Sequence, residues 1–375
     1  MAYRQKKSIL GSIIKLLLLL FVVLFIVGCY KIDYLANNKY IKMAKKRIHS
    51  TISSVTNSAS GSFAALVENY EPDEIDESVY EVSDTQNRYY YNQLDENSKI
   101  IYAEILHNID RIKDGEDNIK ISSKLSSLAD SGDMNNALMV AFQNAWDAFR
   151  NDNVDIFYID GTKMCLVTKM TKRGSQVKYE FFISKGNNNN YFINGFNSKS
   201  QVEQAEKYIE EKETEILESI TEKNDYYRIM NAHNWIVENL EYNLEESNNN
   251  ANIYGALYDN KVVCEGYARL FKSLMDKMNI PCIFVSGEGK NLENGSSEDH
   301  AWNYVFLKGK WYAVDATWDD PIILGGGLAS SDIKYKYFLK GSDDFFESHI
   351  EEGQLVDNGM EFEYPEISKE DYVKQ

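Results

Sequence analysis

The chain has few cysteines and few prolines, with only four of each among its 375 residues. Four cysteines are too few for the disulfide framework of a small secreted domain. Basic residues are also scarce beside acidic ones, 40 against 58, which gives a formal net charge of −18. No long basic run offsets this charge. A field of this sign repels phosphate backbones, so nucleic acid is not expected to be a partner.

The first 28 residues have the pattern of a targeting segment rather than of a folded domain. Four basic residues precede twelve consecutive apolar residues, Leu16–Val27. This run is too short to span a bilayer alone, but it reaches spanning length if it extends back to Ile9 across Lys15. Its end, Ile26-Val27-Gly28-Cys29, resembles the lipobox of bacterial lipoproteins, in which the cysteine is lipidated. An uncleaved signal anchor and a lipoprotein signal both place the following residues outside the cytoplasm, at the cell membrane.

Hydrophobic spacing and turn residues predict the elements that follow. Polar helical spacing and then an acidic stretch predict a helical stalk and linker over residues 30–95. We expect helices over 96–112, 134–150 with Asp133 as N-cap, 199–221 and 225–240, and strands over 155–159, 163–168 and 176–183. Residues 1–29 are then the anchor, 96–198 an N-terminal α+β region, and 199–375 a second domain.

Cys264 is the candidate nucleophile. Apolar residues from Tyr267 to Met278 follow helical spacing and predict a helix over 264–279 that ends before Pro281. Cys264 then lies in the first turn, where unpaired N–H groups and the helix dipole stabilise a thiolate anion. Position alone does not decide its role, because cysteines are also buried at helix starts for packing.

His300 and Asp315 lie in a predicted hairpin whose strands join at Lys308-Gly309. If these two residues form the whole loop, His300 lies opposite Thr317, and Asp315 is its diagonal neighbour on the same face. A three-residue loop would instead put Asp315 on the other face. In the two-residue register the hairpin supplies a base together with its orienting carboxylate, and the preceding helix supplies the thiol.

Three sequence blocks resemble the motifs of the transglutaminase-like superfamily, in particular its bacterial exported branch. They are Val263-Cys264-Glu265-Gly266-Tyr267-Ala268, His300-Ala301-Trp302-Asn303 and Asp315-Ala316-Thr317-Trp318. The resemblance covers about residues 225–320. It implies a papain-like α+β core, in which a helix carrying the cysteine packs on an antiparallel sheet carrying the histidine and aspartate. It also implies Cys264 as nucleophile, His300 as general base and acid, and Asp315 as orienter of the imidazole.

A site of this kind attacks an amide carbonyl and forms a thioester on Cys264. An amine acceptor gives crosslinking and water gives hydrolysis. The expected partner is a protein or peptide amide, including cell-wall peptide, and no cofactor or metal is expected. Tyr254 and Tyr258 are candidates for a second oxyanion donor beside the Cys264 N–H. The alternatives are acyl transfer from a small thioester, which export disfavours, and a non-catalytic scaffold or binding module at the cell surface.

Several other residues could be given a functional role, but a structural role is expected for them. Cys165 and Cys282 lie in apolar runs and are expected to be small buried residues, although pairing of Cys282 with Cys165 or Cys264 stays open. His233 is expected to pack in the core, Glu265 to favour the helix dipole, and the pair Asp319-Asp320 to be solvated. Trp302, Trp311 and Trp318 are expected to pack in the core rather than line a groove. Residues 287–299 lack an apolar pattern and predict a mobile loop beside the site.

Overall fold

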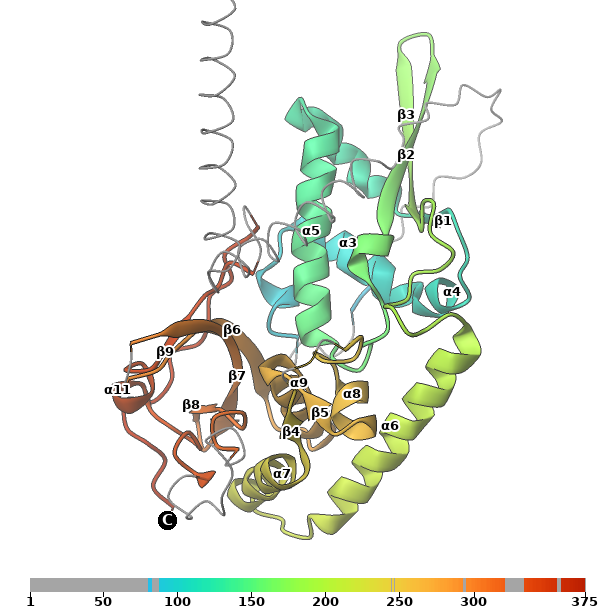
Figure 1. The fold of residues 1–375 in the computed structure, drawn as a ribbon. Coiled ribbons are helices and arrows are strands. Elements are labelled where there is room, and N and C mark those ends of the chain that lie inside the picture. The colour runs from blue at the N-terminus through green and yellow to red at the C-terminus, as the bar shows by residue number, and fades with distance from the viewer. Residues whose placement is uncertain are drawn as a thin grey trace, which may run out of the picture. The chain divides into compact units, whose positions relative to one another are not determined.

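The computed structural model describes residues 80–82, 88–243, 245, 247–292, 295–320, 334–355 and 359–374 (Figure 1). The chain divides into residues 1–53 and 54–375, and every described residue belongs to the second unit. The predicted anchor, the stalk and most of the acidic linker lie outside the described residues. Within the part that is described, no helix is both long and apolar enough to cross a bilayer.

The first described elements combine helices with a three-stranded antiparallel sheet of order β1-β3-β2. They are η2 (Tyr91–Gln93), α3 (Glu96–His107), α4 (Ile109–Lys113), β1 (Ile119–Ile121), η3 (Ser123–Ser131), α5 (Met134–Asp152), η4 (Gly161–Lys163), β2 (Cys165–Arg173) and β3 (Gln176–Ser184). Asp133 caps α5 as predicted, because its side chain accepts a hydrogen bond from the Asn136 N–H.

Two predictions in this region are wrong. The single helix expected over 96–112 is broken at Asn108, whose backbone conformation separates α3 from α4. Residues 155–159 do not form a strand and contribute only an isolated bridge between Ile159 and Phe192. The short strand β1 was not foreseen, since three residues carry too little pattern to be distinguished from a loop.

The second group of elements carries the three candidate residues. It comprises α6 (Lys199–Ser219), α7 (Asp225–Asn239), β4 (Glu241–Tyr242), α8 (Ile253–Tyr258), β5 (Lys261–Val262), α9 (Cys264–Lys277), β6 (Cys282–Lys290), β7 (Ser297–Leu307), β8 (Lys310–Val314), α11 (Ser342–Phe345) and β9 (His349–Glu351). Strands β8, β7, β6 and β9 form one antiparallel sheet in that order. Short parallel pairing between β4 and β5 brings Tyr242 beside Val262, just before α9 begins.

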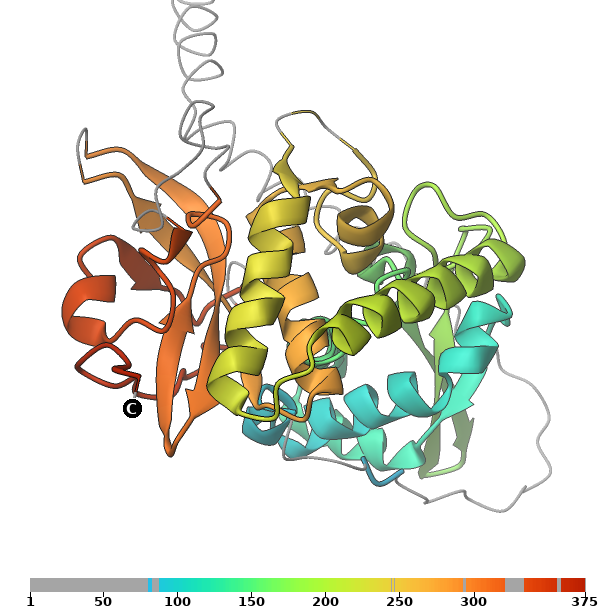
Figure 2. The same ribbon diagram turned by 90° about the horizontal axis from the view of Figure 1, so that it is seen from below.

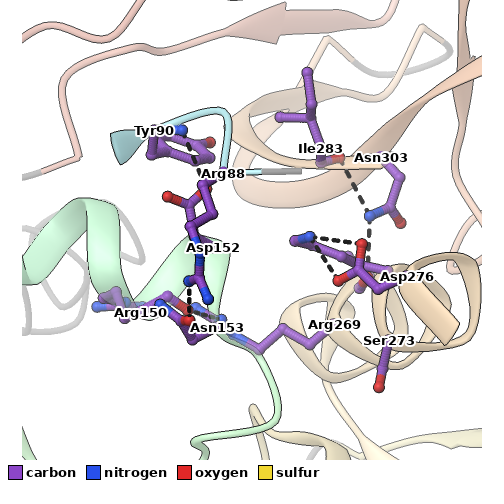
Figure 3. Close-up of polar contacts among 12 residues, drawn as sticks. Arg88, Tyr90, Arg150, Asp152, Asn153, Arg269, Ser273, Asp276, Ile283 and Asn303 are labelled. Atoms are coloured by element: carbon purple, nitrogen blue, oxygen red, sulfur yellow. Dashed lines mark hydrogen bonds and ion pairs between the residues drawn. The ribbon is translucent and has the colours of Figure 1, made fainter. Parts of the chain in front are cut away.

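Helix α9 packs on this sheet, and α7 lies alongside it (Figure 2). Its apolar side is fully buried, with Tyr267, Leu270, Phe271 and Leu274 inaccessible to solvent. The Asn303 amide on β7 donates to the Ala268 carbonyl of the helix at 3.0 Å (Figure 3). The asparagine of the second sequence block therefore joins the nucleophile helix directly to the sheet. The α+β fold with a helix on an antiparallel sheet is as expected.

The hairpin register agrees with the two-residue loop that the sequence predicts. Leu307 pairs with Lys310, and the ladder continues to Asn303 opposite Val314. Both loop residues have positive φ, 52° at Lys308 and 86° at Gly309, as a tight hairpin turn requires. The expected pairing of His300 with Thr317 is wrong, however, because β8 ends at Val314 and the chain then turns away from β7.

The predicted mobile loop over residues 287–299 is also largely wrong. Strand β6 continues to Lys290 and β7 begins at Ser297, so most of this segment is paired sheet. A Cβ at Gly289 would lie 2.8 Å from the Trp318 ring and 3.1 Å from the Cβ of His300. The glycine leaves room above the strand that larger side chains would fill.

The N-terminal elements contact α9 through polar groups as well as through the core. The Arg269 guanidinium on α9 donates to the Arg150 carbonyl at 2.6 Å and to the Asn151 side-chain oxygen at 3.2 Å, both near the end of α5 (Figure 3). Arg269 also donates to Glu265 at 2.9 Å, and Glu265 accepts a bond from Arg150 at the same distance. The first turn of the nucleophile helix is therefore fixed by residues more than 100 positions earlier.

Gly266 tests how tightly this first turn is packed. Glycine to alanine in a helix usually stabilises by about 1 kcal/mol, yet a Cβ here would lie 2.4 Å from the Cβ of Val262. We expect Gly266→Ala to lower the free energy of unfolding by about 1–3 kcal/mol, the usual cost of overpacking. Urea denaturation measures the change.

The control for this substitution is the double variant with Val262→Gly, which removes the crowded atom. The losses of unfolding free energy in the two single variants, Gly266→Ala and Val262→Gly, should together exceed the loss in the double variant. A Gly266→Ala protein that is more stable than the parent would contradict the close contact.

Candidate active site

Cys264 is the first residue of α9, which is the position that the sequence predicts. Its N-cap residue, Val263, offers no side-chain acceptor to the N–H groups of the first turn. The backbone N–H of Cys264 has no intrahelical partner at this position, and it points out of the helix end with the positive pole of the dipole. The side chain is partly buried against Ala268, Phe284 and Ala301. The backbone N–H provides one donor for a developing oxyanion.

His300 on β7 lies between Asp315 and Cys264. Its Nε2 is 2.7 Å from Oδ2 of Asp315, and both side chains are buried. Cys264 lies near enough to contribute to the stabilisation of the charged imidazole. Because Nε2 is engaged by Asp315, Nδ1 is the ring nitrogen that remains for the thiol. The structure therefore brings together all three residues that the sequence selects.

The charges of this pair stabilise each other. Burial alone would lower the pKa of His300, but the Asp315 carboxylate, its hydrogen bond to the imidazole and the neighbouring Cys264 outweigh it and raise the pKa to about 10. Burial would likewise raise the pKa of Asp315, yet the charge and hydrogen bond of His300, together with the bond from His349, hold it well below its usual range. The imidazole is held in its charged form beside an ionised carboxylate.

Asp315 is held by more than His300. Its Oδ1 accepts backbone N–H bonds from Thr317 at 3.0 Å and Trp318 at 3.1 Å, in the turn that follows β8. Its Oδ2 also lies 3.1 Å from Nε2 of His349 on β9. The backbone of the third sequence block thus donates to the Asp315 side chain. These hydrogen bonds form a turn, so the strand ends before Asp315.

His349 is a neighbour of the site that sequence reasoning missed. It reaches Asp315 because β9 adds to the edge of β6, with His349 opposite Gly289. No local sequence pattern near His349 predicts this pairing, because the two strands lie almost sixty residues apart. The only available signal was the scarcity of histidine, since the whole chain has five.

Tyr242 is the second residue missed by sequence reasoning. Its phenol lies beside Cys264, which contributes to the shift of its pKa. Burial and the nearby negative charges of Cys264, Glu298 and Asp315 raise the pKa of this phenol, so it stays protonated and able to donate. The candidates Tyr254 and Tyr258 instead stack on each other at 5.0 Å in an aromatic cluster with Tyr208. Tyr242 replaces them as the tyrosine beside the thiol.

The three tryptophans have different surroundings. Trp302 is 1% exposed and packs against Phe345 and His349, as expected for the core. Trp311 is partly buried against Phe306 on the hairpin. Trp318 stacks on His300 with ring centroids 4.8 Å apart and an interplanar angle of 25°. Trp318 therefore shields the imidazole and its bond to Asp315 from water.

Other expectations divide into confirmed and corrected ones. Cys165 and Cys282 are buried, and all three cysteines of the described residues are free thiols. His233 is fully buried, as expected, with Nε2 3.0 Å from Oδ2 of Asp319. The prediction that Asp319 and Asp320 are solvated is wrong, because both are inaccessible. Asp320 accepts a bond from the Tyr267 hydroxyl at 2.6 Å, so this pair anchors the end of the motif to the core.

Glu265 follows the nucleophile but does not act on it as an unpaired charge. Its two arginine partners, Arg150 and Arg269, outweigh the effect of burial and lower the pKa of this carboxyl. Their positive charges offset the carboxylate that would otherwise oppose a thiolate at the neighbouring residue. Glu265 thus helps to hold the first turn of α9 in place, while Arg150 and Arg269 neutralise its charge.

The donor atoms of His300, Asp315 and His349 all lie within 4.8 Å of one another, so a metal ion must be considered. Zinc ligands at about 2.0–2.2 Å from a shared ion lie roughly 3.3 Å apart in a tetrahedron. The 2.7 Å between His300 and Asp315 is shorter than that and fits an N–H···O bond to a carboxylate. Hydrogen bonding therefore accounts for the cluster.

The chain also contains a polar cavity of about 330 Å³, but the three candidate residues do not line it. Its wall includes Arg88, Asp152, Asn153, Ser273, Asp276 and Lys277, from the N-terminal elements and the far end of α9 (Figure 3). It is separate from the thiol, which lies at the other end of the helix.

Residues 214–316, which include Cys264, His300 and Asp315, match the transglutaminase-like superfamily. The chain contains a transglutaminase-like domain. Kyphoscoliosis peptidase of Mus musculus is 33% identical over 110 residues, and that of Homo sapiens is 31% identical over 125 residues. These stretches cover 27% and 31% of this chain, but only 17% and 18% of the relatives.

Solved structures give weaker likenesses. A transglutaminase crystal structure has a TM-score of 0.29 at 16% identity and covers 46% of this chain and 49% of that one. A putative cysteine protease from Cytophaga hutchinsonii has a TM-score of 0.26 at 23% identity, covering 32% and 40%. The periplasmic domain of TgpA from Pseudomonas aeruginosa has a TM-score of 0.25 at 14% identity, covering 40% and 59%. The assignment of the domain rests on the sequence match and not on these structures.

The charged His300 makes stability depend on pH in a definite direction. Its pKa is raised from 6.5 to about 10 on folding, so its contribution is complete below pH 6.5 and is lost as pH rises toward 10. Over that window the parent protein should lose up to about 1.4 kcal/mol of unfolding free energy per pH unit relative to His300→Gln. Urea denaturation from pH 6 to 10 measures both proteins. Parallel curves would contradict a charged imidazole.

Proposed function

We propose that this protein is a thiol enzyme that attacks amide bonds of protein or peptide, with Cys264 as nucleophile, His300 as general acid and base, and Asp315 as orienter of the imidazole. The observation that carries the proposal is one imidazole with a partner on each side. Nε2 of His300 lies 2.7 Å from Asp315, and Cys264 at the start of α9 lies close enough to the same ring to help raise its pKa. This is the arrangement of a nucleophile, a base and a group that orients the base.

The first half of the proposed reaction forms a thioester. The Cys264 sulfur attacks the amide carbonyl carbon, and the carbonyl π electrons move to oxygen, where the Cys264 N–H donates to the oxyanion. The C–N bond then breaks as the oxyanion collapses. His300 gives its proton to the departing nitrogen, which leaves as ammonia or an amine. The imidazole is then neutral and the acyl group remains on sulfur.

The second half regenerates the thiolate. Water or a primary amine loses its proton to His300 as it attacks the thioester, and the C–S bond breaks. Water yields a carboxylic acid and an amine yields a new amide, so hydrolysis and crosslinking share one intermediate. The hydroxyl of Tyr242, which lies beside Cys264, is a second donor near the sulfur and suits the oxyanion in both halves.

The proposal extends to location. The basic residues and apolar run within residues 1–29 support an anchored protein whose remaining chain lies outside the cytoplasm. A thiol enzyme so placed acts on surface proteins or on peptide of the cell wall. The acidic balance of the chain supports protein or peptide rather than nucleic acid as the substrate.

Substitution of the nucleophile tests the chemistry. We expect Cys264→Ala to lose at least about 10³-fold in activity, because no other group can form the thioester. The measurements are incorporation of dansylcadaverine into casein, which reports crosslinking, and release of casein peptides, which reports hydrolysis. Cys165→Ala is the matched control, since Cys165 is buried on β2 and is not part of the site. Full activity in Cys264→Ala would rule out the proposed reaction.

Thiol reactivity separates an enzyme from a scaffold that only retains the fold. At pH 6 we expect iodoacetamide to alkylate Cys264 at least about 10-fold faster than glutathione, because His300 and the helix start stabilise its thiolate. Peptide mass spectrometry resolves the sites, and buried Cys165 and Cys282 serve as internal comparisons. His300→Gln should remove the enhancement. Labelling of Cys264 no faster than glutathione would favour the scaffold.

A further inference from the structure

Two histidines share one oxygen of Asp315. Oδ2 lies 2.7 Å from Nε2 of His300 and 3.1 Å from Nε2 of His349. His349 and Asp315 have no exposed surface, and His300 is 5% exposed. His349 lies beyond residues 214–316, the part that matches the superfamily. Its contact with Asp315 therefore comes from outside the matched region.

The sheet register explains how both rings reach the same carboxylate. Gly287 on β6 pairs with His300, and Gly289 pairs with His349. Paired residues point to the same face and positions two apart on a strand do so as well, so both histidines stand on one face of the sheet. The strand between them carries glycine at both positions, and neither has a side chain to separate the rings. The ring centroids lie 5.6 Å apart.

The hydrogen bonds fix the protonation of His349. A carboxylate only accepts, so Nε2 of His349 must carry the hydrogen, and Nδ1, 2.9 Å from the Ser348 hydroxyl, can then accept from it. Burial and the nearby His300 charge lower the pKa of His349, although Asp315 opposes them. The ring is thus a neutral donor, and the positive charge of the cluster resides on His300.

The surroundings of His349 hold its ring still. It stacks on Phe345 with centroids 3.9 Å apart and an interplanar angle of 15°. The other rings against it belong to Trp302, Trp318 and Tyr337. Among the residues that the structure describes, the charged groups that act on it are Asp315 and His300, and the phenol of Tyr337 packs against it. A ring packed in this way cannot reach a substrate and acts only through the carboxylate.

We propose that His349 is a positioning residue that holds the Asp315 carboxylate in the orientation that keeps the imidazolium of His300 aimed at Cys264. The proposal rests on the proposed function. With the Thr317 and Trp318 N–H groups on Oδ1 and two imidazoles on Oδ2, the carboxylate is fixed at both oxygens. Without His349, one acceptor site of a buried charge is left empty, and the carboxylate can turn toward other donors.

The test compares His349→Phe, which keeps a ring without a donor, with His349→Gln, which keeps an N–H. The readout is the rate of Cys264 alkylation by iodoacetamide from pH 4 to 9, which follows formation of the thiolate–imidazolium pair. We expect His349→Phe to react about 10-fold more slowly at pH 6, with the acid limb of the profile moved toward neutral pH. His349→Gln should recover most of the rate.

Ser348→Ala supplies a variant that leaves the ring in place. It removes the hydroxyl that fixes the tautomer of His349, so we expect a smaller shift of the acid limb in the same direction. This variant decides the matter if His349→Phe does not fold. The melting temperature is measured for each protein, because a purely structural role would lower it and leave the alkylation profile unchanged.

Two results overturn the inference. One is a folded His349→Phe protein with the parent's profile, and the other is an unfolded His349→Phe together with an unchanged profile in Ser348→Ala. Failure of the proposed function looks different, because in that case the parent's own Cys264 shows no enhanced labelling at pH 6. If Cys264 of the parent is labelled rapidly and the variants have the parent's profile, only the proposed role of His349 is ruled out.

Discussion

A carboxylate that has lost all contact with water keeps its charge only where hydrogen-bond donors replace that water. Asp315 is in this position, and the rest of the site depends on how its two oxygens are satisfied. Backbone N–H groups of the turn after β8 hold one oxygen, and two imidazoles hold the other. The orientation and charge of His300 follow from this arrangement. Through His300, so does the state of the Cys264 thiol.

Each motif block has a structural task besides the chemical role proposed for it. Asn303 ties α9 to the sheet, and Trp318 covers the imidazole. Glu265 is neutralised by arginines that also attach α5 to the first turn of α9. Glycine at positions 266 and 289 permits approaches that a Cβ would block. A thiol group at a helix start is common, whereas this set of surrounding contacts confines it to one geometry.

The sequence predicted those parts of the molecule that depend on short-range pattern. The helix from Cys264, the turn at Lys308 and Gly309, and the closeness of His300 to Asp315 all follow from spacing or loop length. The opposition of His300 to Thr317 failed, because local hydrogen bonds of Asp315 end the strand early. Asp319 and Asp320 were assigned to solvent because their buried partners, His233 and Tyr267, lie far away in sequence.

Tyr242 and His349 could not be found from pattern at all. Tyr242 is carried to the thiol by a two-residue parallel pairing between β4 and β5, which is too short to leave a periodic signal. His349 arrives by edge addition of a three-residue strand to β6. Both contacts depend on which strands pair with each other. That pairing depends on how the whole core packs, and not on the residues next to Tyr242 or His349 in the sequence.

Residues near the two ends of the described chain contact each other, which bears on the order in which the site forms during synthesis. The ring of Tyr90 packs on Phe362 with centroids 5.0 Å apart, and Gln93 exchanges hydrogen bonds with Glu363. His349 also comes from this late segment. During synthesis, therefore, the helix that carries the thiol emerges well before the residues that complete its surroundings. A centre proposed to break amide bonds is finished only after the segment that carries His349 has emerged, so a chain that stops before this segment does not carry a completed site.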